Sequence, residues 1–415
     1  MTGWAAHLYY WIYPGIMVSF MGTLVVYIGQ LFNPNFATGW FSKALICVIF
    51  AGLVGSIALI GVTGSTLINI IINIVQIVSL TFLGLLMILY RFGHPNVNYE
   101  HANVISVVIP HDLIGLIYQA TIAILLLVGF ESATAMAGEA VNPQRDIPKA
   151  VILSLFIQSC ICYFFEYFAA NFFIGDQYTA IVDGQTVTGF GAALASGAPI
   201  GDMAKILGDT LLFGNGFLLQ LLMASTVVMA LIGTGLSSLS TGVRISYAMG
   251  CDRELPTVFG FLHGRYNTPY LGIYFLTGLS ALIGAYAVQS IDNVTIVTLV
   301  SNIGTFMLYG ITCGVTLIAT LEHLLDEEHN PIKTIVIPLL GLIMNLVMVC
   351  GIFYYGLTGS GSAKTNSLTA IVIAIAFFVV GFAYLIGDSL IKGKPLFLPA
   401  DISHPLRDNV GSSQS

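Results

Sequence analysis

Long apolar runs separated by short polar turns fill the sequence from its first residues to about residue 390. A hydropathy window of about 19 residues identifies such runs as membrane spans, because about 20 apolar residues cross the ~30 Å core of a bilayer. The pattern predicts an all-α polytopic membrane bundle over residues 1–389, followed by a tail at 390–415. The ten expected spans are Ala6–Ile28, Ala44–Gly61, Leu67–Tyr90, Leu113–Val141, Ala150–Phe173, Phe213–Ser238, Tyr270–Val288, Val294–Thr320, Ile335–Leu357 and Leu368–Ile386.

The fourth span is longer than a membrane requires. Its 29 residues would extend ~43 Å as one straight helix. Gly129 and Glu131 lie beyond its midpoint, which predicts a helix broken inside the membrane. Irregular backbone at that depth is tolerated only where it faces protein or a water-filled cavity. Because a broken helix exposes free N–H and C=O groups that can hold a polar solute or an ion, the pattern indicates a solute carrier.

Composition favours the same class of protein. Charged residues make up 8% of the 415-residue chain and hydrophobic residues 57%, whereas soluble domains have about 25% charged residues. The net charge of −7 is spread over loops, so nothing indicates a nucleic-acid partner. The six cysteines lack the spacing of zinc ligands, and no metal or cofactor is expected. No sequence motif of an enzyme is present, and GSGSAKT at 359–365 fails the spacing of a phosphate loop.

The distribution of basic residues predicts the orientation. With both termini cytoplasmic, nine Lys and Arg residues fall on the cytoplasmic side and four on the outer side, which agrees with the positive-inside rule. We therefore expect a multi-pass protein of the cell membrane with a cytoplasmic tail. The nine are Arg145, Lys149, Arg244, Arg253, Arg265, Lys333, Lys392, Lys394 and Arg407, and the four are Lys43, Arg91, Lys205 and Lys364.

Two segments carry a resemblance to a known family. One is GFESATAMAGEAVNPQRDIPKAV at 129–151, and the other is VRISYAMGCDRELPTVFGFLHGRYNTPY at 243–270. The first resembles the broken sixth helix and following loop of the amino acid–polyamine–organocation permeases. The second is similar to the link between that family's eighth and ninth helices. The resemblance covers the chain from residue 6 to about 390.

The resemblance implies a secondary transporter that moves amino acids or related amines across the membrane by alternating access. Members of the family usually have twelve spans, the first ten forming two inverted five-helix repeats. Aligned on its motifs, the chain begins at the family's third helix, so we expect an inverted-repeat fold with an incomplete first repeat. The alternative is a truncated, non-transporting membrane subunit or remnant that needs a partner to supply the first two helices.

The resemblance also implies a substrate site at the break. Unpaired carbonyls around Val128, Gly129 and Phe130 would accept hydrogen bonds from a substrate ammonium, and Phe130 would close over the solute. Glu131 and Ser132 complete this segment of the site. The competing interpretation is a glycine that packs against a neighbouring helix, since small residues are common at membrane helix contacts.

Acidic residues inside spans are candidates for gating or proton coupling, because a charge at that depth is costly. Glu131 is either a proton-coupling acid, a polar group that holds the break, or a neutral residue satisfied by the backbone. Glu166, in the next span, either ties two helices together or relays protons. Glu139 and Arg145 flank Asn142-Pro143, where an ion-pair latch or a plain solvated loop is possible; we expect Pro143 and Pro148 to break the helix there.

The sixth span ends in a run of small polar residues. In sodium-coupled relatives of the fold, hydroxyls on this helix ligate a cation, which makes Thr234, Ser237 and Ser238 candidates here, with Ser238 also a substrate contact. Such hydroxyls equally often bond to backbone carbonyls or to other helices. The span Leu67–Tyr90 contains no lysine of the kind that replaces the cation in some proton-coupled relatives. The coupling ion therefore remains open between H⁺ and Na⁺.

Overall fold

The computed structural model describes residues 2–61, 66–93, 109–110, 112–170, 173–174, 179–182, 185–252, 254–322 and 331–392. These residues are almost wholly helical, which confirms the predicted all-α membrane bundle. Nine helices within the described ranges are long and apolar enough to cross a membrane, and a shorter apolar helix covers Leu113–Leu126. Most of the predicted tail, from residue 393 onward, lies outside the described residues.

The elements fall into two groups along the chain, before and after a short hairpin. The first group is α1 (Thr2–Tyr10), α2 (Tyr13–Phe32), α3 (Trp40–Ile60), α4 (Thr66–Gly93), α6 (Leu113–Ala123), the 3₁₀ helices η1 (Ile124–Leu126) and η2 (Phe130–Glu139), α7 (Pro143–Cys162) and the π-helix η3 (Tyr163–Ala170). The antiparallel strands β1 (Thr179–Val182) and β2 (Gln185–Thr188) follow. The second group is α9 (Gly189–Ala195), α10 (Pro199–Leu211), α11 (Gly216–Cys251), η4 (Thr257–Gly260), α12 (Tyr270–Ala287), α13 (Ile291–Leu321), the π-helix η5 (Ile332–Val336), α14 (Ile337–Thr358) and α15 (Gly361–Lys392).

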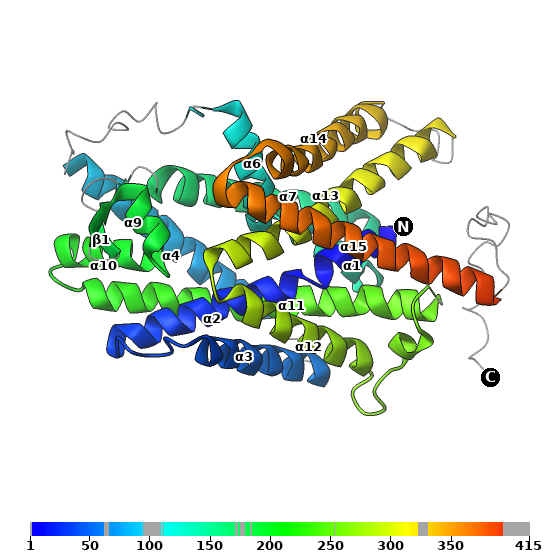
Figure 1. The fold of residues 1–415 in the computed structure, drawn as a ribbon, viewed down its shortest axis with the longest axis horizontal. Coiled ribbons are helices and arrows are strands. Elements are labelled where there is room, and N and C mark those ends of the chain that lie inside the picture. Colours follow the sequence, from blue (N-terminus) through cyan, green and yellow to red (C-terminus); the bar gives the residue numbers. More distant parts are fainter. Residues whose placement is uncertain are drawn as a thin grey trace.

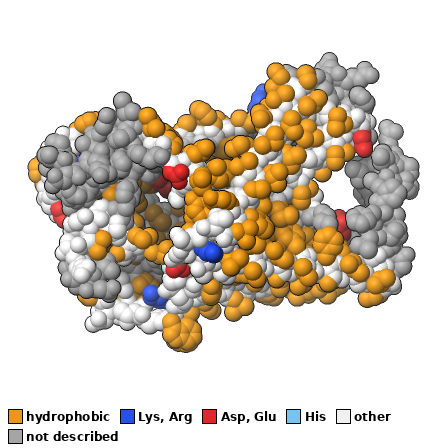
Figure 2. All heavy atoms as spheres, turned by 45° about the horizontal axis from the view of Figure 1, so that its top comes forward, with side chains coloured by type: hydrophobic (Ala, Val, Ile, Leu, Met, Phe, Trp, Pro, Cys, Tyr) orange, Lys and Arg blue, Asp and Glu red, His pale blue; other side chains and the backbone are white. Residues whose placement is uncertain are grey.

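The long helices run roughly along one axis, with β1, α9 and α10 at one end of the bundle and the last turns of α15 at the other (Figure 1). The surface is largely apolar: orange side chains cover most of the described part of the face in Figure 2, and few charged groups interrupt them. Many large hydrophobic side chains on α3, α4, α14 and α15 are exposed. A helix that is apolar on its outer face as well as its inner face is typical of a membrane environment.

Local sequence explains where several helices begin. The side chain of Asp112 accepts hydrogen bonds from the N–H groups of Ile114 and Gly115 and so caps α6. Ser290 caps α13 in the same way through the N–H of Asn293. α7 begins at Pro143, where a proline fits because N–H groups in the first turn have no helical acceptor.

The structure differs from the prediction at two prolines. The first predicted span is two helices, α1 and α2, separated at Trp11 and Ile12. Pro14 lacks an N–H group and cannot continue the hydrogen-bond pattern of the preceding turn. By contrast, α7 runs through Pro148, so our expectation that this residue breaks the helix was wrong: a single missing bond is tolerated within a continuous turn.

Close packing brings α1 against α13. A Cβ at Gly304 of α13 would lie 2.7 Å from the backbone N of Tyr9 and 3.1 Å from Cβ of Leu8, so only glycine permits this approach. The neighbouring residues on both helices are buried, among them Leu299, Val300 and Ile303. α13 also contacts α6 and η1 of the broken fourth span, whose other neighbours include α14 for α6 and α7 for η2.

Hydrogen bonds anchor α10 to two long helices of the bundle. The carboxylate of Asp202 in α10 accepts hydrogen bonds from the hydroxyl of Tyr27 in α2 and from Ser196 Oγ, both at 2.6 Å. Gln220 of α11, which is 1% exposed, donates to the Tyr27 hydroxyl. These bonds hold α10 against both α2 and α11.

Candidate functional site

The fourth predicted span is interrupted at the glycine that the sequence indicates. α6 ends at Ala123, η1 makes one turn of 3₁₀ helix, and a turn at residues 127–129 precedes η2. Gly129 has a φ of 119°, which L side chains rarely adopt. A Cβ built on Gly129 would meet nothing within 4 Å. The backbone angle, and not a lack of space, therefore requires glycine here.

The carboxylate of Glu131 lies at the centre of the interruption. It accepts hydrogen bonds from the hydroxyl of Tyr10 in α1 at 2.9 Å, from the hydroxyl of Tyr309 in α13 at 2.7 Å and from the N–H of Gly129 at 2.9 Å. Oε1 takes the bond from Tyr10, and Oε2 takes the other two. One side chain thus joins α1, α13 and the broken segment.

The three partners of Glu131 differ in whether they can accept as well as donate a hydrogen bond. A tyrosine hydroxyl can donate or accept, but a backbone N–H can only donate. A proton on Glu131 would need an acceptor, and either tyrosine could supply one by turning from donor to acceptor. Such a turn would change how η2 is tied to α1 or to α13.

The carbonyl groups around the break are only partly free. The Gly129 carbonyl, which we expected to be unpaired, accepts from both the N–H and the hydroxyl of Ser132. Gln158 of α7 donates to the carbonyl of Leu126. Among the hydrogen bonds of the described residues, none ends on the carbonyl of Val128, a residue that is buried. Within the described residues it is one of the carbonyls at the break that accept no hydrogen bond, as is that of Leu127.

An aromatic pair lies beside the break. The ring of Phe130 is 5.8 Å from the ring of Tyr309, centroid to centroid, at an interplanar angle of 36°. Tyr9, Tyr10 and Tyr13 of the first two helices are buried nearby in the same cluster as Val128. The site therefore combines one carboxylate with several aromatic rings, a chemistry suited to an organic ammonium group.

The candidate cation side chains do not converge in this conformation. Ser238 is buried in α11 and donates to the carbonyl of Gly235 at 3.1 Å, within its own helix. Thr234 and Ser237 lie on exposed positions of the same helix.

The other candidate gating residues lie away from Glu131 along the chain. Arg145 is exposed in the first turn of α7. Glu139 ends η2, and its side chain lies outside the part that the structure describes. Glu166 is exposed in the π-helix η3, a type of irregularity that is frequent at functional sites.

Sequence reasoning missed the partners of Glu131 and of the freed carbonyls. Tyr10 and Tyr309 are 121 and 178 residues away from Glu131 in the sequence. Gln158 is 32 residues from Leu126. The sequence shows only that each of these polar groups lies within an apolar span. Such a position indicates a contact inside the protein but does not show which residue the group contacts.

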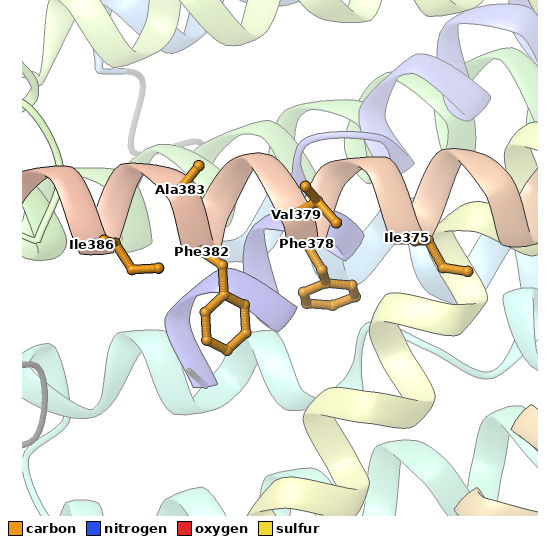
Figure 3. Close-up of a pocket in the computed structure, with 6 residues that line it drawn as sticks. All are labelled: Ile375, Phe378, Val379, Phe382, Ala383 and Ile386. Carbon is orange, nitrogen blue, oxygen red and sulfur yellow. The ribbon is translucent and has the colours of Figure 1, made fainter.

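Two open apolar depressions lie apart from this site. One, of about 460 Å³, is lined by side chains of α15 alone (Figure 3). The other, of about 590 Å³, lies between α13, α14 and α15. The lining of the first is wholly apolar and that of the second almost so, Asn345 being the exception. Neither offers the charged groups that would recognise an amino acid, so the break is the better candidate.

Comparison with known proteins places the chain in a family. The profile of the amino acid permease family matches residues 1–380. The glutamate/serine transporter AimA of Bacillus subtilis is 28% identical over 147 residues, which cover 35% of this chain and 24% of AimA. The branched-chain amino acid permease BcaP of Lactococcus lactis is 29% identical over 162 residues, covering 39% of this chain and 30% of BcaP.

An amine transporter is among the relatives as well. The low-affinity putrescine importer PlaP of Escherichia coli is 24% identical over 199 residues, covering 48% of this chain and 38% of PlaP. In each of these three relatives the match covers less than two thirds of the relative's length. Because the family profile covers nearly the whole chain, the chain belongs to the amino acid permease family.

Proposed function

We propose that this chain is a secondary transporter that moves an amino acid or a related amine across a membrane by alternating access. The observation that carries the proposal is the carboxylate of Glu131 at an interrupted helix, hydrogen-bonded both to α1 and to α13. Membership of the amino acid permease family supports it. So do the relatives, which include transporters of glutamate and serine, of branched-chain amino acids and of putrescine.

The proposed substrate site is the segment from Val128 to Ser132. The free carbonyl of Val128 accepts a hydrogen bond from the substrate ammonium, and Phe130, which packs on Tyr309, closes over the solute. A positive ammonium also attracts the carboxylate of Glu131. Binding therefore competes with the hydrogen bonds that hold Glu131 to α1 and α13. The substrate then makes different contacts in the conformation with these bonds and in the conformation without them. Such a difference is what a ligand needs to shift a conformational equilibrium.

Protons are the proposed coupling ion. Glu131 is an ionisable group within the proposed site, and a proton on it changes its bonds to the two tyrosines. Glu166 is the second proposed acid, at the π-helix of the next span. Coupling to Na⁺ through Thr234, Ser237 and Ser238 is the weaker proposal, because Ser238 donates to its own helix and the other two are exposed.

Membrane and orientation are part of the proposal. The excess of basic residues on one side favours a cell membrane with both termini in the cytoplasm. In that orientation α6 is the outer half of the broken span and η2 the inner half. An ion-pair latch between Glu139 and Arg145 would then lie at the cytoplasmic surface, where exposed pairs contribute under ~1 kcal/mol.

Uptake into proteoliposomes tests the function. The purified chain is reconstituted, and labelled glutamate, serine, leucine and putrescine are offered with and without Na⁺ and with and without an inward proton gradient. We expect uptake of at least one solute above that of protein-free liposomes, increased by the proton gradient and indifferent to Na⁺. Absence of both binding and uptake across the panel, in a chain that elutes as folded material, would favour the alternative of a subunit that needs a partner.

A further inference from the structure

α13 holds the broken span on both sides of the interruption. Nδ2 of Asn302 donates to the carbonyl of Thr121 in α6 at 2.7 Å. The hydroxyl of Tyr309 donates to Glu131 in η2 at 2.7 Å. Asn302 and Tyr309 are seven residues apart, which is about two helical turns or ~10 Å along the same face of α13. One rigid helix therefore bridges the break at two points.

The contact at Asn302 is deeply buried. Both Asn302 and Thr121 are 0% exposed. Thr121 lies in the last turn of α6, where carbonyls begin to lose the N–H donors of a continuing helix. A side-chain amide compensates for this loss within an apolar interior. The other end of the amide, Oδ1 of Asn302, has no hydrogen-bond partner among the described residues, so the donation to Thr121 is the contact that fixes this side chain.

The two contacts differ in chemistry. The bond from Asn302 to Thr121 joins an amide to a carbonyl, and neither group titrates. The bond from Tyr309 to Glu131 joins a phenol to a carboxylate and depends on the charge of Glu131. Of these two contacts of α13, only the one from Tyr309 can therefore respond to a proton or an ammonium at Glu131, whereas the one from Asn302 does not depend on that charge.

We propose that Asn302 is a positioning residue, which keeps α6 fixed on α13 while η2 is released and rebound through Tyr309. The inference rests on the proposed transport function. It divides the broken span into a fixed half, α6, and a mobile half, η2. By holding α6, Asn302 keeps the free carbonyl of Val128 in place for the substrate without touching the substrate itself.

Asn302→Leu is the decisive variant, because leucine is close to asparagine in size and has no group that could donate to the carbonyl of Thr121. Asn302→Ser, which is too short to reach that carbonyl, is the second variant in case the first fails to fold. Asn345→Leu is the matched control. Asn345 is also an asparagine in a membrane helix whose Nδ2 donates to a carbonyl, that of Gly341 at 2.8 Å, but the bond stays within α14.

Two readouts test the proposal. In proteoliposomes, we expect both Asn302 variants to raise the KM for uptake at least tenfold, with the maximal rate within threefold of wild type and the pH profile unchanged. By hydrogen–deuterium exchange, backbone amides of residues 116–128 should exchange at least tenfold faster in these variants and at the wild-type rate in Asn345→Leu. Tyr309→Phe should instead alter the pH profile.

Failure of the proposed transport function and failure of the proposed role of Asn302 give different results. A wild-type protein that neither binds nor transports would defeat the proposed function, yet the exchange measurement would still decide whether Asn302 fixes α6. Unchanged exchange in both Asn302 variants overturns the proposal. So does a control variant that behaves like the Asn302 variants, because the effect would then belong to any membrane asparagine. Faster exchange with an unchanged KM also overturns it, since α6 would then need no fixed position for transport.

Discussion

Glu131 connects three segments through a single carboxylate, and the proposed mechanism depends on the strength of those bonds. A hydrogen bond to a charged group contributes about 1.5–3 kcal/mol. The carboxylate is half-buried and accepts three of these bonds. Removing one donor therefore weakens the tie between η2 and the segment that supplies that donor.

Tyr309→Phe removes one of these donors and leaves the ring in place. We expect the variant to lose about 1.5–3 kcal/mol of stability, measured as a decrease of several degrees in the Tm of the protein in detergent. Tyr13→Phe is the control, because Tyr13 is buried in the same cluster but is not one of the donors to Glu131. An equal decrease in both variants would mean that the loss of any buried hydroxyl, and not the bond to Glu131, sets the effect.

At the scale of elements, the interruption is a backbone feature that one residue permits. Gly129 combines a φ of 119° with empty space around the position of a Cβ. A small side chain at this position would therefore meet no neighbour but would strain the backbone. A substitution at Gly129 therefore tests the effect of backbone strain without an added clash between side chains.

Gly129→Ala should reduce substrate binding at least tenfold while the protein still folds, because the added methyl disfavours the turn that precedes η2. Gly233→Ala is the control. Gly233 lies within α11, also with nothing within 4 Å of its Cβ, and alanine there is favoured over glycine by about 1 kcal/mol. Isothermal calorimetry with the substrate found in the uptake panel compares the two. Wild-type affinity in Gly129→Ala would mean that substrate binding does not require the backbone angle that glycine permits at this turn.

The elements and the site differ in how far the sequence predicts them. The spans and the interruption follow from hydropathy and from Gly129 beside Glu131, since both signals are local. The second helix break, at Trp11 and Ile12, was missed because the apolar run continues across it. Tyr10, Tyr309 and Asn302 could not be assigned partners, because their contacts depend on how distant helices pack. The sequence shows that a span contains a polar residue, but it does not show which neighbouring helix that side chain faces.

For the whole molecule, the direction of the bundle in the membrane is the property on which the other assignments rest. We expect single cysteines at Thr186 or Thr365, in a background without the native cysteines, to react with an impermeant thiol reagent from outside the cell. Cysteines at Gln144 or Asn267 should react only after permeabilisation. All four positions are exposed, so a lack of labelling reports the membrane and not burial. Reversed labelling would place α6 on the cytoplasmic side and refute the orientation drawn from basic residues.

The most direct test of the central claim compares proton-driven uptake by wild type and by Glu131→Gln in the same lipids. The amide keeps the size of the side chain and can still bond to the two tyrosines, but it cannot exchange a proton at physiological pH. We predict that wild type accumulates substrate when a proton gradient is imposed. Glu131→Gln should exchange labelled for unlabelled substrate at a rate independent of pH and should accumulate none. Gradient-driven accumulation by Glu131→Gln at the wild-type level would contradict the account and move the coupling group away from the break.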